Sequence, residues 1–358
     1  MATVASRAAE PAVAGVARPY GPSWPDLAVA WLEALPGPTL LAYAALWAVT
    51  TTSALAQSWI AGQVPVGEIT FAPLIWGSVV PVAFRFWRHM NRVAADAFDA
   101  FRPAISPDAL DLERARYELT TMPSRPALAI LIFSYPFTFA YYAADPVASG
   151  LTGYPPIALA MRATFEGLFT AQILVVCVHV FRQLRLVGRL YAVADRIDLF
   201  HQAPLHAFSR LTARSGIALI AVAVLGYVAN PSPVGLTSAS FALWGPWLIG
   251  FPLAGLAVFI VPLLGIHGRL VAAKADLQGR SEERLKALLT ELNHDVDALD
   301  LSRADGLQKT LGSLLQQREV LAKLSTWPWS TGTLRAFVTA ILLPLALFVV
   351  QRLLAQLV

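Results

Sequence analysis

The chain contains a single cysteine, Cys177, among its 358 residues, and this cysteine lies inside a long apolar stretch. One cysteine cannot form a disulfide framework, and it cannot supply the several thiolates of a cysteine-based zinc site. The sequence also lacks a phosphate-binding P-loop, a dinucleotide-binding glycine motif, a nucleophile elbow and a zincin helix. These absences favour a protein that is not an enzyme and that holds no cofactor and no metal.

Charge is scarce as well. Only 14% of the residues are charged and 56% are apolar, whereas soluble domains carry about 25% charged residues. This composition indicates a chain whose main solvent is a lipid bilayer. The net charge is +4, and basic residues that set membrane topology and contact anionic lipid explain it better than nucleic acid does. We therefore expect membrane lipid, and no nucleic acid, among the partners.

Long apolar runs, by contrast, are abundant. A membrane-spanning helix needs about 20 apolar residues, and seven stretches approach or exceed that length. The second stretch is the weakest prediction, because Pro73 and Pro81 interrupt it. The seven predicted spans are residues 38–56, 69–86, 126–143, 157–181, 215–229, 241–266 and 334–357.

Basic residues follow the positive-inside rule along these spans. The connections 58–67, 144–156 and 229–240 contain no lysine or arginine. The alternate connections carry the basic residues with two exceptions, including all ten from Arg269 to Arg335. This parity predicts an all-α, polytopic membrane protein with seven spans, an inside N-terminus and an outside C-terminus. A cell membrane is the expected location, most simply a bacterial inner membrane.

The segments around the spans divide the chain into four parts. Residues 1–37, rich in alanine and proline, are predicted to be a disordered cytoplasmic tail. Residues 38–266 hold the first six spans with helical cytoplasmic extensions, and residues 334–358 hold the last span. Between them, residues 267–333 carry two leucine-rich stripes at helical spacing, which predict a cytoplasmic helical hairpin.

Three local patterns predict where helices begin or continue. Ser106 followed by Pro107 predicts a helix N-cap and a helix over residues 107–121. The fourth span keeps its helical periodicity past Phe181, so we expect it to extend several turns into the cytoplasm. Ser281, followed by two glutamates, predicts the start of the first hairpin helix.

Two charged residues lie within the fourth span. Arg162 and Glu166 are four residues apart, so they share one face of a helix. Charges at this depth are costly unless they are paired or face water. Two interpretations follow: a polar cavity that is open to a ligand or an ion, or a structural ion pair inside the bundle.

Aromatic residues gather on one face of the third span. Tyr135, Phe139 and Tyr142 follow helical spacing, and with Glu166 opposite they could form a pocket for a small cationic or amphipathic molecule. An aromatic belt at the membrane interface is the commoner origin of such a pattern. The candidate ligand pocket is Tyr135, Phe139, Tyr142, Arg162 and Glu166.

The last span carries a stripe of small or polar residues along one face. Thr333, Ala340, Pro344, Leu347 and Gln351 form this stripe, and the other faces hold Leu, Val and Phe. Such a face suits the lining of a pore, with Ala340, Pro344, Leu347 and Gln351 as candidates. Close packing against another helix through small residues explains it equally well.

The whole organisation resembles the insect odorant and gustatory receptor-like superfamily of seven-helix ion channels. The similarity lies in the topology and in the last apolar run, TLRAFVTAILLPLALFVVQRLL, where Gln351 occupies the place of the family's glutamine. Arg352 stands where the family has an aromatic residue, and the threonine–tyrosine pair that opens the family's pattern is absent. The hairpin between the last two spans is also longer than in the family.

The resemblance implies a homotetramer in which the seventh helices line a central cation pore. It also implies that the cytoplasmic helices hold the subunits together, and that a ligand pocket lies in the outer half of spans three to six. The leading hypothesis is therefore an oligomeric ligand-gated cation channel. Two alternatives stay open: a non-conducting sensor or scaffold that recruits a partner through its cytoplasmic helices, and a small-molecule transporter that uses the Arg162/Glu166 pair.

Overall fold

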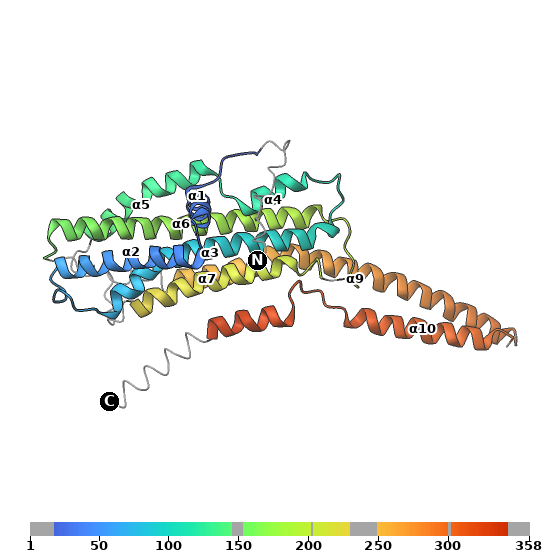
Figure 1. Ribbon diagram of the computed structural model, residues 1–358. Helices are drawn as coiled ribbons and strands as arrows, with labels where there is room; N and C mark the ends of the chain where they lie inside the picture. The colour runs from blue at the N-terminus through green and yellow to red at the C-terminus, as the bar shows by residue number, and fades with distance from the viewer. Residues whose placement is uncertain (1–17, 145–152, 202, 230–248, 300–301, 343–358) are drawn as a thin grey trace, which may run out of the picture.

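The computed structural model describes residues 18–144, 153–201, 203–229, 249–299 and 302–342 (Figure 1). Throughout these ranges the regular structure is helical, and Pro22 and Pro123 form one isolated bridge. The helices are α1 (Trp24–Ala34), α2 (Thr39–Ile60), α3 (Phe71–Phe101), the short η1 (Arg102–Ala104), α4 (Leu112–Thr120), α5 (Ser124–Ala144), α6 (Pro156–Val193), α7 (Ala207–Ala229), α9 (Phe251–Asp297), α10 (Ala304–Lys323) and a further helix, Thr331–Leu342.

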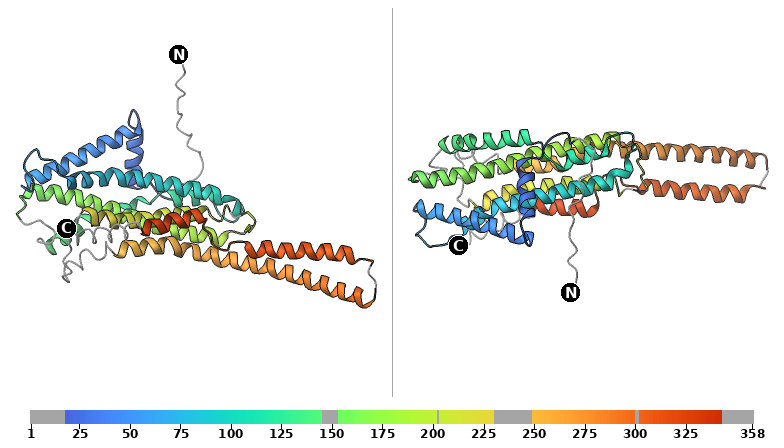
Figure 2. Two further views of the ribbon diagram at one scale, coloured as in Figure 1. Left: turned by 90° about the horizontal axis from the view of Figure 1, so that it is seen from below. Right: turned by 45° about the horizontal axis from the view of Figure 1, so that its top comes forward.

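The long helices form a bundle. Helices α2, α3, α5, α6, α7 and the first half of α9 lie along a common direction, and the views of Figures 1 and 2 agree on this. The closest neighbours are α7 with α9, α2 with α3, α5 with α6, and α3 with α7. Because the helices have largely apolar surfaces, they resemble a membrane bundle rather than the amphipathic bundle of a soluble protein.

Four of these helices are long and apolar enough to cross a membrane: α2, α6, residues Ala207–Val224 of α7, and α9. Helices α3 and α5 cover the predicted second and third spans with 31 and 21 residues. Of the last predicted span, the described part is the helix Thr331–Leu342. The all-helical class is confirmed, whereas the count of seven spans and the orientation of the termini stay predictions.

Two helices continue far beyond the predicted spans. Helix α6 runs for 38 residues to Val193, so the expected extension of the fourth span is confirmed. Helix α9 runs for 47 residues without a break. The predicted helix start at Ser281 is therefore wrong, because Ser281 lies buried within α9. The residues before it include many good helix formers, which let the helix continue.

The helix expected over residues 107–121 begins later than predicted. Its N-cap is Asp111, whose side chain accepts a hydrogen bond from the backbone N–H of Arg114 at 3.0 Å. Ser106 has a different role, because its hydroxyl and its backbone N–H both donate to the carboxylate of Asp195. A tertiary contact thus uses the side chain that the sequence pattern assigned to a local cap.

Helix α1 corrects the prediction of a disordered tail for the second half of residues 1–37. A capping box between Ser23 and Asp26 starts this helix, and α1 crosses the long helices at a steep angle (Figures 1 and 2). Asp26 also accepts hydrogen bonds from the Trp87 indole at 2.8 Å and from the backbone N–H of Met122 at 3.4 Å. Residues 1–17 lie outside the described residues.

Most of the largest hydrophobic core lies where the helices extend past the predicted spans. The ring of Phe101 on α3 contacts the rings of Tyr191 on α6 and Phe208 on α7, with centroids 5.2 and 5.1 Å apart. The Tyr191 hydroxyl donates to the carbonyl of Leu205 at 3.2 Å. Since this core joins three long helices, it fixes their relative positions at one end of the bundle.

Beyond this core, the second half of α9 and helix α10 form a hairpin that projects away from the bundle (Figures 1 and 2). At the tip, Arg303 donates to both carboxylate oxygens of Asp295 at 2.7 Å and to Glu291 at 2.6 Å. At the base, Lys274 donates to the carbonyls of Ala322 and Leu324 at 2.8 Å. These contacts hold the two arms together at both ends.

Candidate ligand-binding site

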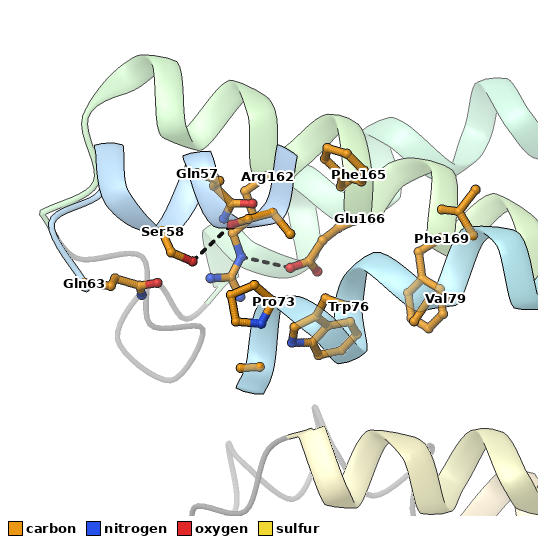
Figure 3. A pocket seen from close by; sticks show the side chains of 13 residues that line it. Gln57, Ser58, Gln63, Pro73, Trp76, Val79, Arg162, Phe165, Glu166 and Phe169 are labelled. Carbon is orange, nitrogen blue, oxygen red and sulfur yellow. Dashed lines mark hydrogen bonds and ion pairs between the residues drawn. The ribbon is translucent and has the colours of Figure 1, made fainter. Parts of the chain in front are cut away.

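A cavity of about 140 Å³ lies between α2, α3 and α6, at the end of the bundle opposite the hairpin. We call it the charged cavity, because Arg162 and Glu166 both line it (Figure 3). The other lining residues are Ala54, Gln57, Ser58, Gln63, Ala72, Pro73, Trp76, Val79, Val80, Phe165 and Phe169.

Arg162 and Glu166 form an ion pair along one turn of α6. The guanidinium Nε donates to the Glu166 Oε1 at 2.8 Å, and the two side chains are 24% and 27% exposed. A second guanidinium nitrogen donates to the Tyr154 hydroxyl at 3.1 Å, and the guanidinium lies over the Tyr154 ring. Each charged group therefore has a partner and still faces an open space.

Helix α2 and the turn after it contribute neutral polar groups to the same space. Gln57 and Ser58 come from the last turns of α2, and Gln63 comes from the turn that follows (Figure 3). The Ser58 hydroxyl donates to the carbonyl of Ala54 at 3.1 Å. Amide side chains carry both donors and acceptors, so they could contact either end of a dipolar ligand.

Aromatic residues of α3 and α6 together form one wall of the cavity. The Trp76 ring meets the Phe169 ring edge to face, with centroids 5.9 Å apart, in an orientation that aromatic pairs prefer. Phe169 also lines a second, larger space on the other side of this wall. The wall thus separates the charged cavity from its neighbour.

The structure brings together only part of the predicted pocket. Arg162 and Glu166 line the charged cavity, but Tyr135 and Phe139 do not. The Tyr135 ring packs over Gly167, where an added Cβ would lie 2.6 Å from it, and Phe139 is 50% exposed. Tyr135 was expected to lie opposite Glu166, but its ring meets α6 at Gly167 instead. The side chain of Tyr142 lies outside the described residues.

The described part of the last helix packs against the bundle through the face that carries Phe337 and, beside it, Ala340 of the stripe proposed as a pore lining. Phe337 is buried and stacks on Phe259 of α9 with centroids 4.1 Å apart. Ala340 lies one turn further on the same face and is half-buried, so its described surroundings match helix packing better than a pore lining. Pro344, Leu347 and Gln351 lie outside the described residues.

Sequence reasoning missed the residues that α2 and α3 bring to the cavity. Gln57 and Ser58 are polar residues at the end of an apolar run, and this position was the sequence feature that could have indicated a polar site there. Trp76 and Phe169 have no such signal, because an aromatic residue in an apolar helix has many possible neighbours. Among the described residues, no group of three or more His, Cys, Asp or Glu side chains could hold a metal ion.

Comparisons with protein families, with curated proteins and with solved structures found no match. The apolar helices are those of a multi-pass membrane protein.

Proposed function

We propose that this chain is a ligand-responsive membrane protein whose ligand binds at Arg162 and Glu166 in the charged cavity. The observation that carries this proposal is a guanidinium–carboxylate pair that faces an open space within a bundle of apolar helices. Ionisable groups inside membrane segments are costly and usually mark a ligand or ion pathway. A purely structural pair would be expected to lie in a filled space.

The size and polarity of the charged cavity limit the ligand. Its volume of about 140 Å³ is close to that of an apolar cavity of about 150 Å³ that holds one benzene molecule. The lining supplies a cation, an anion, amide groups and the indole of Trp76. A small zwitterion suits this set, with its carboxylate toward Arg162 and its ammonium group toward Glu166 and the aromatic wall.

The output that we propose is a cation channel formed by several copies of the chain, four if the resemblance to the receptor-channel superfamily holds. Val338 and Leu342 on the last helix are exposed, and both point away from the buried Phe337. Apolar surface of this kind is covered by lipid or by another subunit. Pro344, Leu347 and Gln351 lie outside the described residues and stay our proposed pore-lining or gating residues, by the resemblance alone.

A second candidate is a sensor or scaffold that recruits a partner through the hairpin. The hairpin extends past the bundle, and Leu289, Leu299 and Leu315 on it are exposed. In water such leucines favour contact with another protein surface. A third candidate, a transporter coupled through Arg162 and Glu166, would show ligand flux across liposomes without ion currents.

Ligand binding is tested on the full-length protein in lipid nanodiscs with a panel of small amino acids and quaternary amines. A ligand at about 100 times its Kd stabilises the native state by about 2.7 kcal/mol, which a thermal-unfolding assay detects. Glu166→Gln should abolish this stabilisation and leave the native mass unchanged. The matched control is Glu118→Gln, which alters another i,i+4 ion pair, with Arg114, outside the cavity. Equal stabilisation of Glu166→Gln and the native protein would overturn the proposal.

The channel is tested separately by native mass in mild detergent and by planar-bilayer recordings. An oligomer with ligand-dependent cation currents, altered in selectivity by Gln351→Ala, would support it. A monomer without currents would contradict the channel but not the ligand site. The function would then be partner recruitment through the hairpin or transport of the ligand.

A further inference from the structure

A second space, of about 730 Å³, lies between α3, α6 and α7, with Phe251 of α9 at its edge. We call it the apolar groove, because most of its lining side chains are aliphatic or aromatic. Along α3 it reaches from Ile75 to His89, about 21 Å at 1.5 Å per residue. It is therefore long and narrow, and it suits an extended chain better than a compact molecule.

Gln172 gives the apolar groove a buried polar group. This residue lines the groove and is 4% exposed, and both its amide nitrogen and its amide oxygen lack a hydrogen-bond partner. A buried amide without partners costs about 1–3 kcal/mol, so a stable fold rarely keeps one without reason. An oxygen atom of a bound molecule would satisfy it.

One end of the apolar groove is cationic. Arg214 on α7 donates to the Nε2 of His89 on α3 at 3.2 Å. Burial, followed by the positive charges of Arg214, Arg85 and Arg92, lowers the pKa of His89. The imidazole is therefore neutral and accepts this bond, and the three guanidiniums near it supply the charge. No carboxylate of the described residues appears among the charges that act on His89.

The spacing of the two polar points can be estimated from the contacts of α3 with α6. Trp76 contacts Phe169, and Trp87 stacks on His179. The two helices are therefore parallel, and each residue of α3 lies beside the residue of α6 whose number is about 92 or 93 higher. Gln172 then lies beside residue 79 of α3. That position is about 15 Å from His89 along the helix axis.

We infer that the apolar groove binds a long-chain carboxylate that carries an oxygen function part-way along its chain. The carboxylate would lie at Arg214, the hydroxyl or carbonyl oxygen would bond to the Gln172 amide, and the hydrocarbon would fill the space between. Charge complementarity at one end and an unpartnered amide further along select this occupant over an ordinary phospholipid chain. A phospholipid has no oxygen so deep in the hydrocarbon. The inference does not depend on the ligand proposed for the charged cavity.

The test uses the full-length protein in nanodiscs of zwitterionic lipid and three radiolabelled probes: 12-hydroxyoctadecanoate, octadecanoate and methyl 12-hydroxyoctadecanoate. The native protein should bind the hydroxy acid about tenfold more tightly than octadecanoate, because one net hydrogen bond is gained. Gln172→Leu should remove this difference without weakening octadecanoate. It removes an unpartnered buried amide, so the variant should also fold at least as stably as the native protein.

Arg214→Gln should weaken both acids by about tenfold or more and leave the methyl ester unchanged, because the lost interaction is charged. The control Arg189→Gln removes an exposed arginine of α6 that does not line the groove. Ala221→Phe, at an exposed lining position, should block all three probes without burying a larger side chain in the core.

Three outcomes would overturn the inference. If all three probes bind equally to the native protein and to both polar variants, they only partition into lipid. If bilayer phospholipid displaces the hydroxy acid as readily as it displaces octadecanoate, the groove binds ordinary acyl chains. If Gln172→Leu changes no preference, the amide is satisfied by water alone.

Discussion

Gly216 on α7 and Gly255 on α9 approach so closely that a Cβ added to either would lie 2.5 or 2.6 Å from the carbonyl oxygen of the other. Neither glycine has a positive φ, so their role is close contact rather than backbone freedom. Small residues let helix backbones approach in this way inside membranes. Because α9 continues into the hairpin, this crossing determines how the hairpin is held against the bundle.

Substitution of Gly216 should therefore separate α7 from α9. We expect Gly216→Leu to lower the free energy of unfolding by about 3 kcal/mol or more, since the side chain meets backbone that cannot move aside. The control is Gly265→Ala in α9, where an added Cβ meets nothing within 4 Å. That control should be neutral or stabilising by up to about 1 kcal/mol, because alanine is the better helix former. Equal unfolding curves for Gly216→Leu and the native protein would contradict this packing.

Asp26 is the second residue whose loss should be costly. Its carboxylate accepts bonds from the backbone N–H and the hydroxyl of Ser23 and from Trp87, Asn91 and Met122. Asp26→Ala would therefore remove the reciprocal half of the capping box of α1 and leave five donors without this acceptor. We expect a loss of about 2–3 kcal/mol and protease cleavage near α1 at lower denaturant concentration. Asp96→Ala, at an exposed position of α3, is the control. Unchanged cleavage of Asp26→Ala would show that α1 is held by its apolar contacts.

Hydropathy and spacing predicted where most of the long helices lie, because an apolar run of sufficient length has few alternatives in lipid. They did not predict α1, whose position depends on Asp26 meeting Trp87 and Met122 far along the chain. They also misplaced the start of the hairpin. Ser281 carries a cap signal, but cap signals do not stop a helix whose neighbours on both sides favour it.

The charged cavity shows the same limit. The four-residue spacing of Arg162 and Glu166 predicted that they share one helix face, since that geometry is local to one helix. An ion pair was one of the two interpretations, and the two side chains do form one. The face of α5 that packs on α6 depends on contacts between two helices, so spacing within one helix does not predict it. Gly167 determines this packing, because it leaves room for the Tyr135 ring. Tyr135 consequently lies away from the cavity, and Gln57, Ser58 and Trp76 line it instead.

Stability should decrease as the pH falls, in part through His206. This residue lies in the turn before α7, and burial lowers the pKa of its imidazole, with a hydrogen bond to the Trp327 backbone acting in the opposite direction. The unfolded histidine, with a pKa of about 6.5, takes up its proton before the folded one does. The contribution of the neutral His206 imidazole to the free energy of unfolding is therefore fully present above a pH of about 6.5 and is lost as the pH falls below that value.

The check compares unfolding midpoints of the native protein and His206→Gln at about pH 7.5 and about pH 5.5, values on either side of the unfolded pKa. The variant should lose less stability between the two conditions than the native protein. His89 is shifted in the same direction, so the variant should keep some pH dependence. A larger loss in His206→Gln would mean that the charged imidazole stabilises the fold.

Phe169 stands between the two candidate sites, because both the charged cavity and the apolar groove use its side chain as a wall. Phe169→Ala would remove the edge-to-face contact with Trp76 and join the two spaces, at a cost of about 2 kcal/mol for a half-buried ring. The joined space should admit larger ligands at Arg162 and Glu166, and a long-chain acid in the groove should then compete with a small zwitterion for binding. Phe165→Ala is the control, since Phe165 lines only the charged cavity of the two. The measurement is competition between the two ligands, with each ligand labelled in turn. If the two ligands compete equally in Phe165→Ala, or do not compete in Phe169→Ala, then the Phe169 ring does not separate the two sites.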